Sequence, residues 1–162
     1  MRTLRRPPRS TGSPSTTPAP PPASSWATPP EFYLDENITT RAVRRLLLGL
    51  GYTVHTPAGL FGTREAALSQ DDEVWLARVA GTGWAVINRD VSISRKPDEL
   101  AAYQRAGVHM FYLPGEAKVA ELVHLMEANL AAIGTETMGR QPRLWYVKPS
   151  GLEEIRFSTR SR

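Results

Sequence analysis

The sequence predicts an α/β fold in which two layers of helices enclose a mainly parallel β-sheet. Along residues 31–158, short apolar runs alternate with longer segments whose apolar residues recur at helical spacing. This alternation is typical of βαβ units. The run from Trp84 to Ile87 is apolar at every position, which is typical of a parallel strand buried on both faces. We therefore expect a three-layer sandwich.

The domain is predicted to begin in the order strand, helix, strand. Residues 31–34 form an apolar run that ends at Asp35. Residues 38–50 carry apolar side chains at helical spacing and are followed by Gly51, which favours a helix end. Residues 52–55 are then the second strand, so the three segments form one βαβ unit.

A long connection leads from this unit to the buried strand. Residues 56–71 are rich in glycine and polar residues and are predicted as a loop, with a helical turn at 64–68. A short helix is expected over 72–80, with apolar positions at Val74, Trp75, Ala77 and Val79. The glycines in 81–83 end it before the strand begins.

The C-terminal half continues the alternation and ends in a pair of strands. A Pro-Gly turn precedes its long amphipathic helix, and a second turn joins the last two strands. The expected elements are a helix over 97–106, a strand over 108–113, a helix from 119 to at least 130, and strands over 144–148 and 152–157.

Residues 1–30 differ in composition from the rest of the chain. They hold nine of the 14 prolines, a run of Ser and Thr, and almost no large apolar residue. Such a segment cannot bury enough surface to fold. We expect a disordered tail over 1–30, a domain over 31–158 and a flexible C-terminus over 159–162.

The excess positive charge lies in the predicted tail. The formal net charge is +4, and the tail carries four arginines and no acid, so 16 basic and 16 acidic residues remain from residue 31 onward. A basic tail can contact a polyanion such as nucleic acid, but we interpret it as a solvated extension. No apolar run suits a signal sequence or a membrane span, which predicts a soluble, cytoplasmic protein.

Three acids stand where predicted strands end or a helix begins. Asp35 follows the first strand, Asp72 opens the short helix and Asp90 follows the buried strand. Each could cap a helix or bond to loop backbone. However, the carboxyl ends of parallel strands meet at one edge of a sheet, where the preceding helices also begin. Three carboxylates there would repel one another unless protons or a cation neutralised them.

Carboxylate oxygens in an open arrangement suit Mg²⁺ or Mn²⁺. The chain has no cysteine, which excludes thiolate ligands, and its three histidines are scattered over different predicted elements. A divalent ion at such a site lowers the pKa of a bound water and stabilises a leaving oxygen. The acids therefore point to phosphodiester hydrolysis.

At these acids the chain resembles the PIN-like nuclease domains, in particular their short branch related to bacterial toxin ribonucleases. The resemblance covers about residues 31–130. Its most specific part is the 18-residue step from Asp72 to Asp90, which selects Asp72 over Asp71. The matching motifs are Leu34-Asp35, Asp72-Glu-Val-Trp75 and Asn88-Arg89-Asp90.

The resemblance implies a metal-dependent endoribonuclease that leaves a 5′-phosphate. It assigns Asp35, Asp72 and Asp90 as catalytic residues and as ligands of Mg²⁺ or Mn²⁺. It also implies RNA as substrate and an antitoxin protein as partner, and it allows a homodimer.

Two positions depart from the family pattern. Asn88 replaces a threonine, although its amide can still orient a ligand or phosphate, and Ser92 stands where a second acid is frequent. If Ser92 marks a lost site, the chain is a PIN-like module that binds RNA or a partner without catalysis. The other candidates for a further ligand are Glu36, Glu65, Asp71 and Glu73.

Several cations are candidates for binding RNA phosphates. Arg89, Arg95 and Lys96 lie near the proposed site in the sequence. A basic cluster beside acids can bind phosphate, but it is equally common as a solvated loop. The arginines of the first helix are interpreted as a solvated face because they lie opposite its apolar stripe. These are Arg41, Arg44 and Arg45.

A phosphorylated receiver domain is an alternative from a different functional class. Asp35 and Glu36 after the first strand and Asp90 after the third would suit it. Such domains usually also carry Ser or Thr after the fourth strand and Lys after the fifth. Here only Lys148 is a match of that kind, and Asp72 would have no role.

Overall fold

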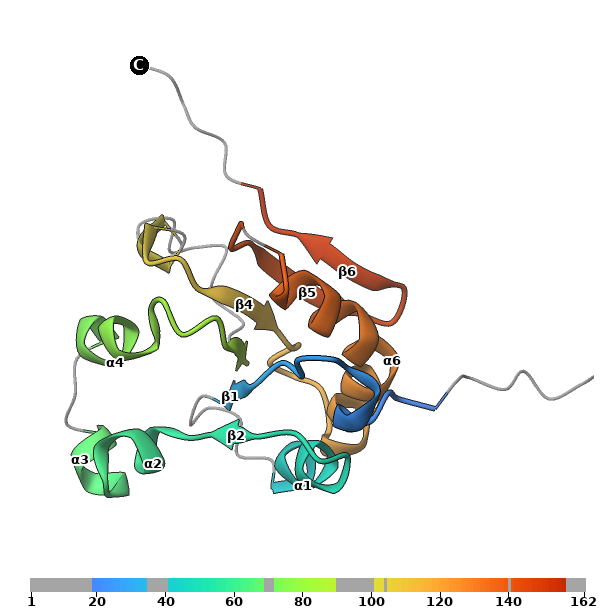
Figure 1. Cartoon of the computed structure of the whole chain (residues 1–162), viewed down its shortest axis with the longest axis horizontal. Helices are drawn as coiled ribbons and strands as arrows, with labels where there is room; N and C mark the ends of the chain where they lie inside the picture. Colours follow the sequence, from blue (N-terminus) through green and yellow to red (C-terminus); the bar gives the residue numbers. More distant parts are fainter. Residues whose placement is uncertain are drawn as a thin grey trace, which may run out of the picture.

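The computed structural model describes residues 19–34, 41–68, 72–89, 101–103, 105–139 and 141–156. They form a six-stranded sheet with helices on both faces (Figure 1), which confirms the predicted α/β sandwich. The strands are β1 (Phe32–Leu34), β2 (Val54–His55), β3 (Ala85–Asn88), β4 (His109–Tyr112), β5 (Leu144–Lys148) and β6 (Gly151–Glu154). The helices are η1 (Ala23–Ser25), α1 (Arg41–Gly49), α2 (Pro57–Phe61), α3 (Arg64–Leu68), α4 (Asp72–Val79) and α6 (Val119–Thr137).

The strand order creates a switch point at the centre of the sheet. The order is β2-β1-β3-β4-β5-β6, and every pair is parallel except the β5–β6 hairpin. From β1 the chain crosses to β2 on one side, whereas β3 to β5 are added on the other. The register pairs Leu34 with Ile87. The carboxyl ends of β1 and β3 therefore lie side by side.

One face of the sheet is covered by α1 and α6. Their buried residues include Val43 and Leu47 from α1 and Leu122, Met126 and Leu130 from α6. This apolar stripe of α1 is the predicted one. The strand side chains that meet these helices alternate along the sheet, as the two-residue period of a strand requires. They include Phe32, Leu34, Ala85, Ile87 and Phe111.

The other face is covered by α2, α4 and the helical residues 101–103 and 105. In α4 the residues that face this core are Trp75, Leu76 and Val79, and the Trp75 ring stacks on Tyr33 with centroids 5.8 Å apart. The predicted apolar stripe of α4 also included Val74 and Ala77, which are both exposed, Val74 to 40%. The stripe was therefore wrong at these two positions, because the helix is rotated so that Leu76 faces the core.

Residues 19–30 contact the domain. The prediction that the whole of 1–30 is a disordered tail is therefore wrong for these residues. The backbone N–H of Ala23 donates to the Leu50 carbonyl oxygen at 2.8 Å, and Ala23 is buried. Tyr52 Oη donates to the Pro21 carbonyl oxygen at 2.6 Å and accepts from Trp26 Nε1 at 2.8 Å. Burial raises the pKa of the Tyr52 phenol, while the Trp26 hydrogen bond acts in the opposite direction.

Composition failed here because a few anchoring side chains suffice to hold a Pro-rich segment against a domain. Trp26 packs against the core formed by α1 and α6. The predicted boundary at residue 30 is therefore too late, since the contacts with the domain already include Pro21. Residues 1–18 and 157–162 lie outside the described part of the chain.

The remaining element predictions hold closely, with one helix missed. The predicted loop contains α2, whose start has recognisable signals: Thr56 Oγ1 accepts from the Gly59 N–H at 3.2 Å, and Pro57 occupies the first turn. The turn predicted at 64–68 is α3. The helix predicted from Pro97 lies partly outside the described residues. No helix in the part of the chain that the structure describes is long and apolar enough to cross a membrane.

Candidate active site

The candidate site lies at the carboxyl ends of β1 and β3. β1 ends at Leu34 and β3 at Asn88, and the paired positions Leu34 and Ile87 make the two ends neighbours. Asp35 follows the first strand directly, and Asp90 is two positions beyond the second. In open parallel sheets, ligands bind beside the strand ends where the strand order reverses. This is the place where the order reverses around β1.

Most of the acids predicted for the site lie outside the described residues. These acids are Asp35, Asp90 and the secondary candidates Glu36 and Asp71. Ser92 and the predicted phosphate-binding cations Arg95 and Lys96 also lie outside the described residues. Asp72 is the first residue of α4 and Glu73 is the second, as predicted, but the positions of their side chains are not described. Among the described residues, no three His, Asp or Glu side chains are grouped to hold a metal ion.

The helix α4 is positioned to begin near the same edge. It runs into β3 through a short turn in which Gly81 and Gly83 adopt φ values of 76° and 74°. Such positive φ values are easily adopted only by glycine. A helix that precedes a parallel strand runs against it, so its first residue lies toward the strand's carboxyl end. The turn therefore reverses the chain between α4, which begins at Asp72, and β3.

Asn88 holds the end of β3 in place. It is 5% exposed, and its Oδ1 accepts a hydrogen bond from the backbone N–H of Arg89 at 2.6 Å. Its carbonyl oxygen accepts from the Leu113 N–H at 2.8 Å, which ties β3 to the residue after β4. The carboxamide that was predicted to orient a ligand thus has a defined backbone role just before Asp90.

Arg89 ties the end of β3 to the loop before α6. Its Nη2 donates to the Ala117 carbonyl oxygen at 2.7 Å. Its Nε is buried and has no hydrogen-bond partner among the described residues. Burying an unpaired donor of a cation is unfavourable. Within the described part of the chain, the guanidinium that was predicted to contact phosphate therefore has one structural bond and one buried donor without a partner.

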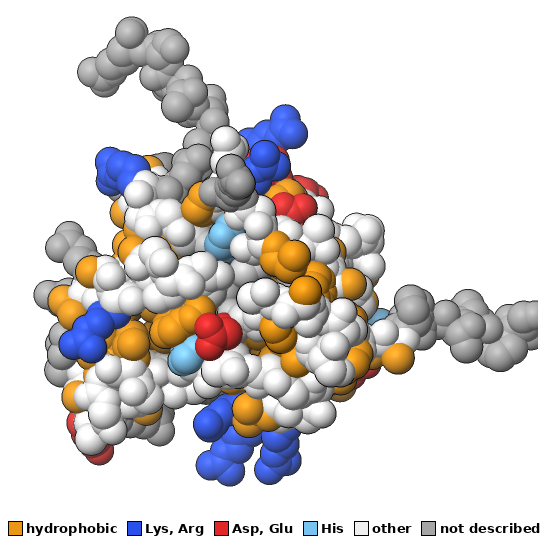
Figure 2. Space-filling view, in the orientation of Figure 1, with side chains coloured by type: hydrophobic (Ala, Val, Ile, Leu, Met, Phe, Trp, Pro, Cys, Tyr) orange, Lys and Arg blue, Asp and Glu red, His pale blue; other side chains and the backbone are white. Residues whose placement is uncertain are grey.

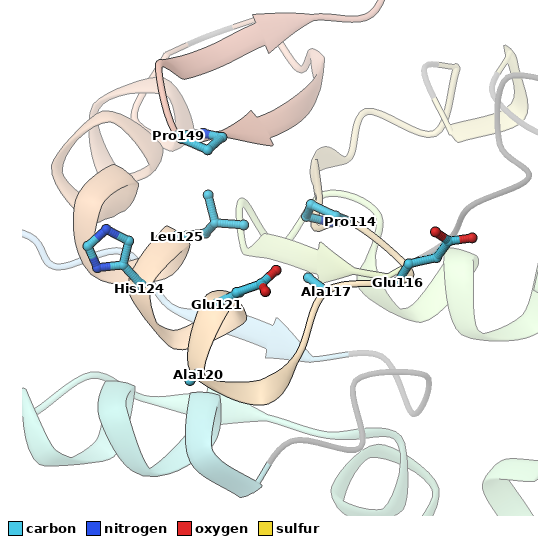
Figure 3. Close-up of a pocket in the computed structure, with 8 residues that line it drawn as sticks. All are labelled: Pro114, Glu116, Ala117, Ala120, Glu121, His124, Leu125 and Pro149. Atoms are coloured by element: carbon cyan, nitrogen blue, oxygen red, sulfur yellow. The ribbon is translucent and has the colours of Figure 1, made fainter.

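The loop between β4 and α6 carries an acid that the sequence analysis did not select. Glu116 is exposed and lies one position before Ala117, the partner of Arg89. In Figure 3 its carboxylate points away from Leu125, on the opposite side of the loop from α6. The Pro114-Gly115 turn after the fourth strand was the signal that could have identified this loop as part of the strand-end edge.

A groove of about 660 Å³ lies between this loop and α6 (Figure 3). Its walls are mainly apolar, with Glu121 pointing into the space toward Ala117. A smaller hollow of about 290 Å³ extends over the ends of β4 and β5. The larger groove is lined by Pro114, Glu116, Ala117, Ala120, Glu121, His124, Leu125 and Pro149.

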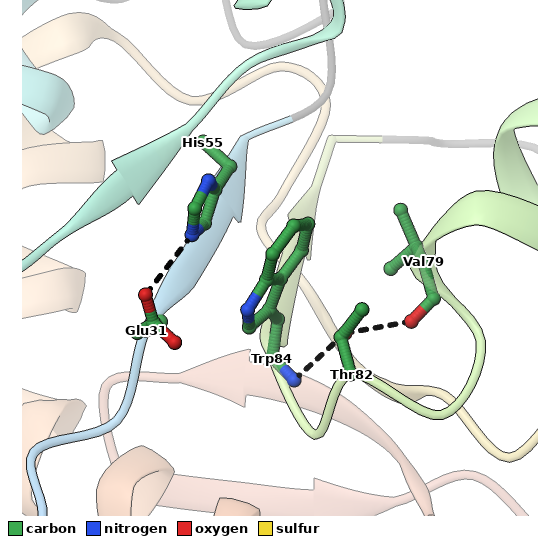
Figure 4. A network of polar contacts seen from close by, with 5 residues as sticks. All are labelled: Glu31, His55, Val79, Thr82 and Trp84. Atoms are coloured by element: carbon green, nitrogen blue, oxygen red, sulfur yellow. Dashed lines mark hydrogen bonds and ion pairs between the residues drawn. The ribbon is translucent and has the colours of Figure 1, made fainter. Parts of the chain in front are cut away.

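A second polar cluster lies near the starts of β1 and β3 (Figure 4). The His55 ring stacks on Trp84 with centroids 3.7 Å apart, and its Nε2 lies 3.2 Å from Glu31 Oε1. Glu31 and Trp84 directly precede β1 and β3, and His55, the last residue of β2, pairs with Tyr33 of β1. The cluster therefore lies toward the amino-terminal side of β1 and β3. The contacts of His55 with Glu31 and Trp84 are structural.

Comparison with protein families matches residues 30–115 to a family described as a PIN-like domain. The match covers slightly more than half of the chain and includes β1, α4, β3 and the loop through Gly115. Comparisons with curated proteins and with solved structures found no match.

Proposed function

The chain belongs to the family of PIN-like domains, and from this premise we propose that it is a divalent-metal-dependent endoribonuclease. The family is in general one of nucleases, and such domains typically use divalent metals. The observation that supports a site of this kind is the switch point, where the carboxyl ends of β1 and β3 are direct neighbours. Each end leads within two residues to an aspartate.

The donor set of the proposed site fits a hard cation. Neighbouring strands lie about 4.8 Å apart, so chains leaving Leu34 and Asn88 start from points compatible with a shared ion. Oxygen ligands from Asp35, Asp72 and Asp90 suit Mg²⁺ or Mn²⁺. When bound, such an ion activates water and stabilises developing negative charge on a phosphate.

The protein's own residues position this chemistry. The carboxylates of the three aspartates would hold the ion, and Asn88 fixes the backbone immediately before Asp90 through its bond to the Arg89 N–H. The Arg89 side chain holds the loop around Ala117 beside the same strand end. Positioning of this kind accounts for a large part of catalysis in phosphoryl transfer, because the reacting groups must lie in line.

We further propose that the ribonuclease is the toxin of a toxin–antitoxin pair, acts in the cytoplasm and is neutralised by an antitoxin protein. The resemblance of the Asp72 to Asp90 segment to the short branch of toxin-related domains supports this assignment. A PIN-like module that binds RNA without cutting it is the second candidate. It is favoured by Ser92 and by the backbone role of Asn88.

A receiver domain is a weaker explanation. Lys148, the one late residue that would suit it, is exposed and forms an ion pair with Glu153 in the β5–β6 hairpin. Membership in the PIN-like family also gives Asp72 a role that a receiver domain would not. Incubation with acetyl phosphate should therefore leave Asp90 unmodified.

The test compares wild type with Asp35→Asn, Asp72→Asn and Asp90→Asn. Thermal unfolding is followed without metal and with Mg²⁺ or Mn²⁺, and cleavage of a structured RNA is measured in parallel. We expect the metal to stabilise wild type by mass action, and each substitution to abolish both this gain and cleavage. Without metal, each variant should unfold at or slightly above the wild-type temperature, because one of several repelling charges is removed.

The control substitution is Glu136→Gln on α6. It removes one carboxylate about 26 Å along the helix from its first residue, so both cleavage and metal stabilisation should persist. Metal-indifferent wild type, with all three aspartate variants destabilised, would instead mean three capping or loop-bonding acids. RNA binding and metal stabilisation without any cleavage would favour the non-catalytic module.

A further inference from the structure

The helix α1 presents an exposed face of arginines. Arg41, Arg44 and Arg45 are all exposed, and their spacing places them on one side of the helix. The opposite side packs into the core through Val43 and Leu47. Figure 2 shows Lys and Arg side chains gathered at the lower edge of the molecule, where Figure 1 places α1.

These arginines have no counter-charge among the residues that the structure describes. The helix sequence contains no acid. No ion pair or side-chain hydrogen bond joins any of the three to another described residue. Like charges three and four positions apart on a helix destabilise it. The three arginines therefore lower the stability of α1, and the packing of the helix against the core does not need them.

The cations on and beside the β5–β6 hairpin, in contrast, form ion pairs. Arg143 Nε lies 3.9 Å from one oxygen of Glu154, and Arg156 Nε lies 3.8 Å from the other. Lys148 is paired with Glu153. Each of these three cations therefore has an acidic partner, in contrast to those of α1. They provide a control set with the same formal charge.

The face begins a short stretch of chain after β1, whose carboxyl end leads to the candidate active site. Arg41 is seven positions after Leu34, the last residue of β1, which limits their separation to about 25 Å even for an extended chain. A helix that follows a parallel strand starts from the strand's carboxyl edge. Arg41 and Arg45 are about 6 Å apart along the helix axis. This arrangement suits successive phosphates of one strand entering the site.

We propose that the α1 face, Arg41, Arg44 and Arg45, binds the phosphate backbone of single-stranded RNA beside the ends of β1 and β3. The inference rests on the proposed ribonuclease function, because it gives the substrate a path to that site. Guanidinium groups bind phosphate through paired N–H donors and always carry their charge. The sequence alone favoured a solvated face, since it could not show that the arginines lack counter-charges.

The test measures RNA binding separately from cleavage. Fluorescence anisotropy of a labelled, unstructured 20-nucleotide RNA is followed over a salt series in EDTA, so that metal-dependent cleavage cannot occur. The full chain is compared with R41Q/R44Q/R45Q and with the control R143Q/K148Q/R156Q, which has the same net charge. Both triple variants are repeated with the tail arginines Arg2, Arg5, Arg6 and Arg9 replaced by glutamine, so that the tail cannot mask the effect.

On a single strand, the slope of log K against log salt decreases by about 0.7 for each phosphate that the protein no longer neutralises. We expect the α1 variant to lose about 2 units of slope and at least tenfold in affinity, and the control to lose much less. Equal slopes for wild type and the α1 variant, equal losses in the control, or no RNA binding by wild type would each overturn the inference. Binding of labelled polyglutamate is measured in the same way. If the α1 variant loses polyglutamate binding but keeps RNA binding, the face binds an acidic protein and the inference is overturned.

The two proposals can fail separately. If wild type binds RNA through α1 but never cleaves it with Mg²⁺ or Mn²⁺, the nuclease assignment fails and the binding face stands. If wild type cleaves RNA and the α1 variant binds and cleaves equally well, only the binding face fails. Circular dichroism of both triple variants checks that α1 remains folded, as expected for exposed substitutions.

Discussion

Arg89 and Ala117 lie 28 positions apart in the sequence and are joined by a hydrogen bond of 2.7 Å from Nη2 to the carbonyl oxygen. The bond connects the end of β3, next to Asp90, with the loop that carries Glu116. It therefore links two loops that follow neighbouring strands, the one after β3 and the one after β4. The first prediction follows from it.

Replacing Arg89 by glutamine should loosen the loop around Ala117. Hydrogen bonds from charged donors contribute about 1.5–3 kcal/mol, and Arg89 is only partly buried, so we expect a loss of about 1–2 kcal/mol in the free energy of unfolding. Amide hydrogen exchange at residues 115–118 should accelerate. Arg105→Gln, at an exposed position, should change stability by less than about 0.5 kcal/mol. Unchanged exchange in the Arg89 variant would contradict the tether.

Truncation should separate the two parts of the N-terminal segment. Removing residues 1–18 should leave the melting temperature unchanged, because their composition does not support a core. Removing residues 1–30 deletes the Ala23 and Trp26 contacts and should cost on the order of 3 kcal/mol, as for the loss of a large core side chain. Urea unfolding of both truncated chains checks this. Equal stability of the two would show that the segment adds nothing to the fold.

Gly134 and Trp26 should show strong coupling in a double-mutant cycle. A Cβ at Gly134 would lie 2.6 Å from Cζ2 of Trp26, so Gly134→Ala should destabilise the full chain. With Trp26→Ala the clash disappears, and alanine should then stabilise α6 by about 1 kcal/mol through its higher helix propensity. The effect of Gly134→Ala thus changes sign between the two backgrounds. Additive effects would contradict the packing of Trp26 on α6.

Stability should depend on pH through His109 on β4. Burial lowers the pKa of this histidine from its ordinary value of 6.5, so below pH 6.5 the unfolded chain binds a proton that the folded chain resists. Stability is therefore fully present above pH 6.5 and is lost as the pH falls through the folded pKa. Urea unfolding from pH 7.5 to 5 should show this loss, and His109→Gln should reduce it. An unchanged pH profile in the variant would assign the dependence to other groups.

The order of the elements was predictable from the sequence because periodicity depends only on neighbouring residues. The apolar run of β3 and the stripe of α1 gave these elements nearly at their observed bounds. α2 was missed because its five residues span little more than one turn, too few for a helical pattern to repeat, although Thr56 and Pro57 marked its start. Val74 was predicted to face the core because periodicity shows that a helix has an apolar side but locates the centre of that side less well.

The candidate site was predictable in part. The strands that precede Asp35 and Asp90 are parallel and end at the same side of the sheet, as the sequence analysis expected, and α4 begins at Asp72. The sequence analysis did not select Glu116. The Pro114-Gly115 turn marked the end of the fourth strand, but the place of this loop beside the end of β3 follows from the pairing of β4 with β3. It also could not assign Arg89 to the Ala117 carbonyl, since that contact needs two loops in three dimensions.

The sequence by itself determined the α/β class, the alternation of elements and the positions of the acids, because these depend on local spacing and on residue type. Only the tertiary structure decided which strands are neighbours, that residues 19–30 pack through Trp26, and that the α1 arginines lack counter-charges. These features depend on contacts between residues far apart in the chain. No local pattern encodes them, because the same short segment can pack against different partners.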